Sequence, residues 1–168
     1  MVRLSWLLVL IAVLAATRPV PPAHAQAGND AATGEVIVAL PPEIAWSDGP
    51  PELPAGAQFA LLEGNPAEAV PLTLRLKFPA KYRIPPHWHS VIEHVTVLTG
   101  TLYVGMGEKA EYSGGVALSA SSFAAMPKKM VHYAWTGDEG VVFQLHSIGP
   151  WSITYVNPQD DPRQTGGK

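Results

Sequence analysis

The segment HWHSVIEHVTVLTG, residues 87–100, places two imidazoles and a carboxylate close together within apolar sequence. Side chains alternate between the two faces of a strand, so His87 and His89 would point the same way, with Cα atoms roughly 6.5–7 Å apart. On a helix the same two side chains would diverge by about 200°. Pro85 and Pro86 also disfavour a helix directly before His87. The segment therefore predicts a strand that presents two imidazoles on one face.

Glu93 has the same parity as the two histidines, and so do Val95 and Val97, if the chain keeps its register through any kink at Ser90–Val91. A carboxylate that faces an apolar interior is costly unless a cation or a hydrogen-bond donor pairs with it. Imidazole and carboxylate ligands suit one divalent ion such as Mn, Fe, Ni, Cu or Zn. The chain has no cysteine that could add a thiolate ligand. The alternative is a surface loop with exposed histidines and Glu93 in a surface salt bridge.

A second segment, AAMPKKMVHYAW at residues 124–135, favours the metal site over the surface loop, because its proline and histidine lie in a turn before another β-prone run. With both segments, the chain resembles the cupin superfamily. The first cupin motif ends in His-x-His, three or four residues, Glu, six residues and Gly, and the second motif has Pro five positions before His. The matching residues are His87, His89, Glu93, Gly100, Pro127 and His132. The resemblance extends from about Gly56 to Val156.

The resemblance implies an all-β fold with few helices, in the form of a cupin-type antiparallel β-barrel similar to a jelly roll. It also implies one divalent metal ion (Mn, Fe, Ni, Cu or Zn), held by His87, His89, Glu93 and His132. Single-domain cupins include dioxygenases, isomerases, decarboxylases and lyases that act on small oxygenated molecules. The resemblance is therefore specific for fold and metal but not for a reaction.

The chain departs from the cupin motifs at four places. Lys81, Ser121 and Lys129 stand where the motifs have glycine, and Thr136 stands where the second motif has asparagine. Glycine at such places supplies turns with positive φ, which other residues rarely adopt. We therefore expect these loops to turn differently, and the sequence fixes the position of His132 less well than that of the other three ligands.

The chain has 168 residues, of which 47% are hydrophobic, enough for one domain with a core of its own. We expect a Pro-rich N-terminal arm at residues 26–56, a cupin β-barrel domain at 57–156 and a C-terminal tail at 157–168. No window of the domain has a 3.6-residue apolar period, so helices should be few. Short β-prone runs of this kind are typical of an antiparallel sandwich or barrel. The runs are QFALLE, VPLTLRLKF, VIEHVTVL, TLYVGM, VALSA, SFAAMP, VHYAW, VVFQLHSI and WSITYV.

The first residues, MVRLSWLLVLIAVLAATRPVPPAHAQA, have the layout of a secretory signal peptide, with a basic start, an apolar run and small residues at Ala23 and Ala25. The apolar run is shorter than the roughly 20 residues that a membrane-spanning helix needs. We therefore expect a signal peptide at residues 1–25, cleaved after Ala25 or Ala27, and no stable membrane insertion afterwards. An uncleaved anchor is the alternative. This prediction places the protein in the periplasm or outside the cell.

The charge of the chain bears on its partners. The formal net charge is −3, and it becomes −5 once residues 1–25 and their two arginines are removed. No basic patch is present that could hold nucleic acid at physiological salt, so we expect a small-molecule ligand or substrate instead. His94 and Trp88 have the opposite parity to the ligands. His94 is expected to be half exposed, with a role as supporting ligand left open, and Trp88 to be an outer packing residue or an interface anchor, which would allow a homodimer.

The run VVFQLHSI, residues 141–148, offers two further polar candidates. Gln144 and His146 share one face of the expected strand, and Phe143 and Leu145 share the other. If the polar pair faces inward, Gln144 would donate a hydrogen bond to a bound ligand and His146 would carry a proton near neutral pH. Both would then be catalytic. The alternative is that the pair faces outward.

Three functional hypotheses follow. The first is a metal-dependent enzyme with oxygenase-like or lyase-like chemistry on a small carbonyl, enol or carboxylate compound, since four protein ligands leave positions of an octahedral ion open. A dioxygenase, an isomerase, a decarboxylase and a lyase are all compatible with it. The second is a noncatalytic module that binds a metal or small ligand, and it predicts a cavity with no acid or base besides the ligands. The third is a purely structural barrel.

Overall fold

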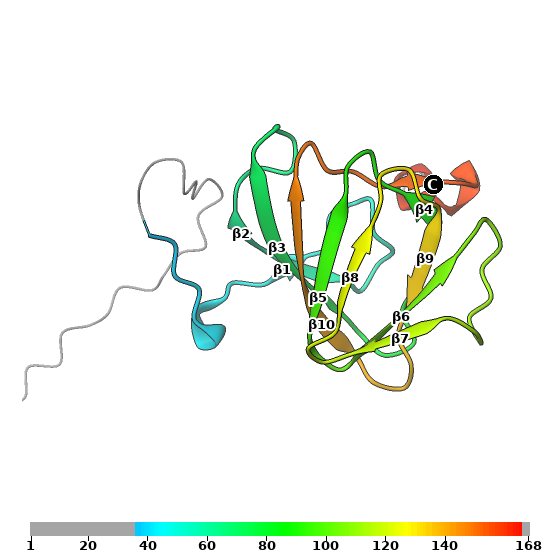
Figure 1. Cartoon of the computed structure of the whole chain (residues 1–168), viewed down its shortest axis with the longest axis horizontal. Coiled ribbons are helices and arrows are strands. Elements are labelled where there is room, and N and C mark those ends of the chain that lie inside the picture. The colour runs from blue at the N-terminus through cyan, green and yellow to red at the C-terminus, as the bar shows by residue number, and fades with distance from the viewer. Residues whose placement is uncertain (1–35, 166–168) are drawn as a thin grey trace, which may run out of the picture.

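A computed structural model describes residues 36–165 as two antiparallel β-sheets (Figure 1). The predicted signal peptide and the first part of the predicted arm lie outside the described residues. The six-stranded sheet has the order β1 (Ser47–Asp48), β2 (Gln58–Glu63), β3 (Pro71–Phe78), β10 (Val141–Ile148), β5 (Glu93–Thr99) and β8 (Phe123–Met126). The five-stranded sheet has the order β11 (Thr154–Tyr155), β4 (Arg83–Trp88), β9 (His132–Trp135), β6 (Thr101–Met106) and β7 (Val116–Ser119).

The prediction of an all-β antiparallel fold with few helices is confirmed. Within the described range, the helical elements are the 3₁₀ turns η2 (Pro41–Glu43) and η3 (Pro158–Asp160) and the single turn α1 (Pro162–Thr165). None of the helices in this range is long and apolar enough to span a membrane. The two sheets do not close into a barrel, because strand pairing stops at β1 and β8 in one sheet and at β11 and β7 in the other. The molecule is a two-sheet sandwich around one core.

The core forms where the alternation of β3 and β10 turns apolar side chains inward. On β3, Leu72, Leu74, Leu76 and Phe78 are buried, while the residues between them are half-buried or exposed. Phe143 of β10 lies opposite Leu76 in the ladder, and its ring contacts that of Phe78 edge to face. Each fully buried side chain of this size contributes about 1.5–3 kcal/mol relative to an exposed one. The polar face of the six-stranded sheet consequently points away from the core.

Strand β4 carries two prolines and still pairs with its neighbours. The ladder between β4 and β9 is irregular between Ile84 and His87, where Pro85 and Pro86 have no N–H to donate. Beyond the prolines, pairing resumes with His87 opposite His132. The prolines therefore limit the ladder without removing the strand.

The loops at Lys81, Ser121 and Lys129 correct one expectation. Their φ angles are 59°, 72° and 63°, so the three residues adopt the left-handed conformation that glycine adopts most easily. The prediction that these loops turn differently is wrong. This conformation costs about 1–2 kcal/mol for a residue with a Cβ atom, and backbone hydrogen bonds hold each turn in place. They run from the three amides to the carbonyls of Gly137, Val97 and His89, respectively.

The segments before and after the sandwich contact it only in places, and Val36, Val38 and Leu40 of the arm are exposed. In the expected arm, β1 pairs with β2, and Trp46 lies 5.9 Å from the ammonium of Lys77 on the outer face of β3. In the expected tail, the Asn157 side chain caps η3, and Arg163 forms an ion pair with Asp161 at 2.7 Å.

Candidate metal centre

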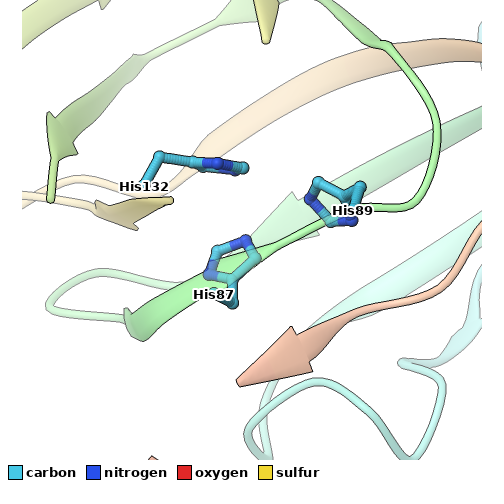
Figure 2. Close-up of side chains that lie close together, drawn as sticks. All are labelled: His87, His89 and His132. Atoms are coloured by element: carbon cyan, nitrogen blue, oxygen red, sulfur yellow. The ribbon is translucent and has the colours of Figure 1, made fainter. Parts of the chain in front are cut away.

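Two neighbouring strands and the bend after β4 bring three imidazoles together. His87 lies in β4, His89 follows directly after its end, and His132 begins β9. One ring nitrogen from each histidine can be chosen so that all three lie within 4.8 Å of one another. Each side chain is about 3% exposed. Figure 2 shows the three rings gathered around one point between the sheets, as the shared parity of His87 and His89 predicted.

Backbone carbonyls fix the ring orientation of all three histidines. Their Nδ1 atoms lie 2.7 Å from the oxygen of Pro85 for His87, 2.8 Å from that of Ser152 for His89, and 3.0 Å from that of Met130 for His132. A carbonyl only accepts hydrogen bonds, so each Nδ1 must donate. In a neutral ring, Nε2 then carries the lone pair, which is the form that binds a metal.

Glu93 begins β5 in the other sheet and completes the cluster. It is 6% exposed, and its carboxylate lies 3.5 Å from Nε2 of His89 and 3.7 Å from Nε2 of His132. Both distances exceed those of a good hydrogen bond. Nε2 of His89 is buried without a hydrogen-bond partner among the described residues. After His89 the chain bends and enters the second sheet, where Glu93, Val95 and Val97 are buried. The prediction that these three residues face inward together with His87 and His89 is confirmed.

The Nε2 atoms of the three histidines and the carboxylate of Glu93 are all hydrogen-bond acceptors, and they face one another. A buried carboxylate beside imidazole lone pairs, with no proton between them, is unfavourable unless a cation lies among them. Nitrogen and oxygen ligands of this kind fit a borderline divalent ion. We refer to His87, His89, Glu93 and His132 below as the histidine–glutamate cluster. The four residues predicted as ligands are thus brought together.

Burial keeps two of the histidines neutral. Desolvation lowers the pKa of His87 well below its usual value, and the neighbouring His132 and His89 lower it further. Desolvation also lowers the pKa of His132, although Glu93 opposes this effect. A proton therefore competes poorly with a metal ion for these rings.

A cavity of about 30 Å³ adjoins the histidine–glutamate cluster. Apart from the cluster, its walls are leucine, isoleucine, valine, phenylalanine, methionine and alanine side chains, with the indole of Trp151 among them. Neither lysine nor arginine lines this cavity. Among the described residues that line the cavity, only those of the cluster have titratable side chains.

The predicted inward orientation of Gln144 and His146 is wrong. Phe143 and Leu145 are 4% and 0% exposed, and they occupy the core face of β10. On the opposite face, the amide nitrogen of Gln144 lies 2.8 Å from Nε2 of His146. Nδ1 of His146 lies 3.0 Å from the hydroxyl of Thr73. The apolar side chains of β10 fill the core, so Gln144 and His146 face away from it. The predicted catalytic role required these two side chains to face inward.

His94 also lies on the outer face, opposite His146 in the ladder between β5 and β10. Its ring stacks on that of Phe123 at 5.9 Å. It is half-buried, as its parity predicted, and it is not one of the clustered histidines.

Trp151 and Ser152 are site residues that the sequence reasoning missed. The carbonyl of Ser152 orients His89, and the indole of Trp151 stacks on the same ring at 5.1 Å. The run WSITYV contains both residues, but it signals only a strand. Their role depends on where the chain returns to the cluster, which no local pattern encodes.

Comparisons with known proteins bear on the fold. No family model matches the sequence, and no curated protein does either. Among solved structures, an RmlC-like cupin from Shewanella frigidimarina is 15% identical, with a TM-score of 0.52 over 66% of this chain and 89% of that chain. The chain has the cupin fold. The polyketide cyclase RemF from Streptomyces resistomycificus is 13% identical, with a TM-score of 0.61 over 77% of this cupin-fold chain and 92% of its own. The DMSP lyase DddQ from Ruegeria pomeroyi is 17% identical, with a TM-score of 0.55 over 69% and 62%.

Proposed function

We propose that this cupin-fold protein is a metal-dependent enzyme that acts on a small oxygenated organic molecule, by oxygenase-like or lyase-like chemistry. The observation that carries the proposal is the histidine–glutamate cluster itself, in which three buried imidazoles and a buried carboxylate converge. A second support is that the similar structures RemF and DddQ are named as a cyclase and a lyase.

In this proposal the three imidazoles and Glu93 hold the ion. A bound divalent ion would polarise an oxygen of the substrate. The carbonyls of Pro85, Ser152 and Met130 keep the Nε2 atoms aimed at the centre. The apolar walls exclude water, which strengthens every charge interaction inside the cavity.

A noncatalytic binding module is the second candidate, and the orientation of β10 favours it. With His146 outside, the cavity has no acid or base besides the proposed ligands. Such a module would capture a metal or a small ligand without turning it over. For either candidate we propose export to the periplasm or the medium, on the basis of the signal-peptide pattern at residues 1–25.

Parallel loading of the stripped protein with Mn, Fe, Ni, Cu or Zn tests the proposal. Each form is incubated with small carbonyl, enol and carboxylate compounds, with and without dioxygen, and product formation is followed by mass spectrometry. The enzyme hypothesis predicts turnover by at least one metal form and none by the stripped protein or by the His87→Ala variant. His94→Ala is the control with an unchanged cluster. Binding of compounds without product in every metal form would support the noncatalytic module instead.

A further inference from the structure

Among the described side chains that line the cavity, apart from the histidine–glutamate cluster, the indole of Trp151 is the one that carries a polar hydrogen. The ring lies 5.1 Å from that of His89 with an interplanar angle of 20°, so it is stacked on a proposed ligand. The backbone holds it there, because the Trp151 amide donates to the Pro66 carbonyl at 2.8 Å.

The indole N–H has no partner to receive its hydrogen bond. Nε1 of Trp151 is buried and makes no hydrogen bond to any described residue. Burial of a donor without an acceptor is unfavourable, and a tryptophan at such a place usually has its N–H satisfied. Besides Trp151, the described side chains that line the cavity are those of the cluster, which carry its acceptors, and apolar side chains.

We propose that Trp151 is a substrate-binding residue, whose N–H donates a hydrogen bond to an oxygen of a small molecule with an apolar body. This inference rests on the proposed metal-dependent function and names its substrate class. The oxygen-bearing head of the molecule lies at the cluster, beside the stacked rings of His89 and Trp151, and its carbon body contacts the apolar walls. A second charged group on the molecule has no lysine or arginine to pair with, so doubly charged acids are excluded.

The small volume of the cavity limits the size of this molecule. At about 30 Å³ it is far smaller than most ligand pockets. Leu53 and Ile153 line it from the loop before β2 and from the segment after Trp151. The Tyr155 hydroxyl donates to the Glu52 carbonyl at 2.7 Å and ties the two segments together. A molecule of several carbon atoms therefore fits only if side chains of the cavity wall move.

Two carboxylic acids of the same shape test the proposal on zinc-loaded protein. In 4-methylpentanoate an apolar isopropyl group stands in the place of the second carboxylate of succinate. We expect 4-methylpentanoate to shift the indole N–H signal of Trp151 in a ¹⁵N NMR spectrum, and to bind at least about tenfold more tightly than succinate. Trp151→Phe keeps a ring against His89 and removes the N–H, so it should weaken binding of 4-methylpentanoate roughly two- to tenfold without loss of zinc. Trp88→Phe is the control, since Trp88 does not line the cavity.

Equal affinity of the Trp151→Phe variant and the wild type for 4-methylpentanoate would overturn the proposal. So would equal binding of succinate, or an indole N–H signal that no concentration of 4-methylpentanoate moves, which would indicate water as the partner. Failure of the wild-type chain to retain zinc would count against the proposed metal centre rather than against Trp151. The indole signal of the metal-free wild type then decides whether Trp151 meets the probe.

Discussion

Glu93 is the residue whose charge distinguishes a metal centre from a buried polar cluster. Its carboxylate faces Nε2 of His89 and of His132 at 3.5 and 3.7 Å, distances too long for a good hydrogen bond. Without a cation this contact destabilises the fold, and with a cation it strengthens binding. The Glu93 carboxylate should therefore lower the stability of the metal-free protein and raise that of the metal-bound protein.

Glu93→Gln separates these two effects, since it keeps the shape and removes the charge. We expect the metal-free variant to be more stable than the wild type by about 1–3 kcal/mol, because the amide can donate to a ring nitrogen. Its metal affinity should fall by at least about tenfold. Urea unfolding of the metal-free protein and competition with a chromogenic chelator measure the two quantities. His94→Gln, on the outer face of the same strand, should change neither, and a Glu93→Gln variant that binds metal as well as the wild type would exclude Glu93 as a ligand.

The lowered pKa of His87 and of His132 predicts a pH dependence for the metal-free protein. Between the folded and the unfolded pKa of each ring, the unfolded chain binds more protons than the folded chain. The free energy of unfolding should therefore be constant above about pH 6.5, the usual histidine value, and fall as the pH is lowered through the window beneath it.

Thermal unfolding of the metal-free protein between neutral and mildly acidic pH measures this dependence. The His87→Ala variant should lose part of the slope, whereas His94→Ala should keep it. A midpoint that stays constant in the wild type through this window would show that the buried rings are not held neutral.

At the scale of single elements, the turn around Lys129 positions two members of the cluster at once. The Lys129 amide donates to the carbonyl of His89 at 2.8 Å, and His132 follows three residues later. Lys129 has a φ of 63°, where a Cβ atom costs about 1–2 kcal/mol. The turn therefore positions His89 and His132 although its backbone is strained at Lys129.

Lys129→Gly should remove this strain. Glycine also makes the unfolded chain more flexible, so we expect a net gain of stability of up to about 1 kcal/mol. Lys128→Gly is the matched control, because Lys128 is not among the residues with positive φ and should only lose stability. Chemical unfolding of both variants gives the comparison. A loss of the same size in both would show that the left-handed turn is not strained.

Alternation along the strands is the part of the fold that could be predicted from sequence. The parity of His87, His89 and Glu93 gave the correct inward face, and the cupin spacing added His132. Parity could not decide which face of β10 is buried, because that depends on the core contacts of Phe143 with β3. The local sequence also cannot predict a left-handed φ at a lysine or serine, because hydrogen bonds to distant parts of the chain impose it.

At the scale of the whole molecule, the sequence left open whether the sheets form a sandwich or a barrel, and the return of Trp151 to the cluster could not be predicted. Closure of a sheet depends on which edge strands meet, and β1 and β11 are only two residues long each. The ring of Trp151 reaches His89 from a position 62 residues later in the chain. Contacts between such distant segments follow from the packing of both sheets.

Export is a second property of the whole chain that stays a prediction. If residues 1–25 are a signal peptide, the mature protein begins at or near Gln26 and is recovered in soluble form from the periplasm or the medium. Mass spectrometry of the native protein determines its N-terminus. An intact chain that begins at Met1 in the membrane fraction would contradict the prediction.

The metal content of the purified chain tests the central claim most directly. Wild-type protein, His89→Ala and the outer-face control His94→Ala are dialysed together and analysed by mass spectrometry for bound elements, with circular dichroism to confirm the β fold. Nε2 of His89 is the buried acceptor without a partner in the described chain, so its removal should matter most. The account predicts one divalent ion per chain in the wild type and in His94→Ala, and loss of that ion from a folded His89→Ala. Full retention of the metal by His89→Ala would contradict it.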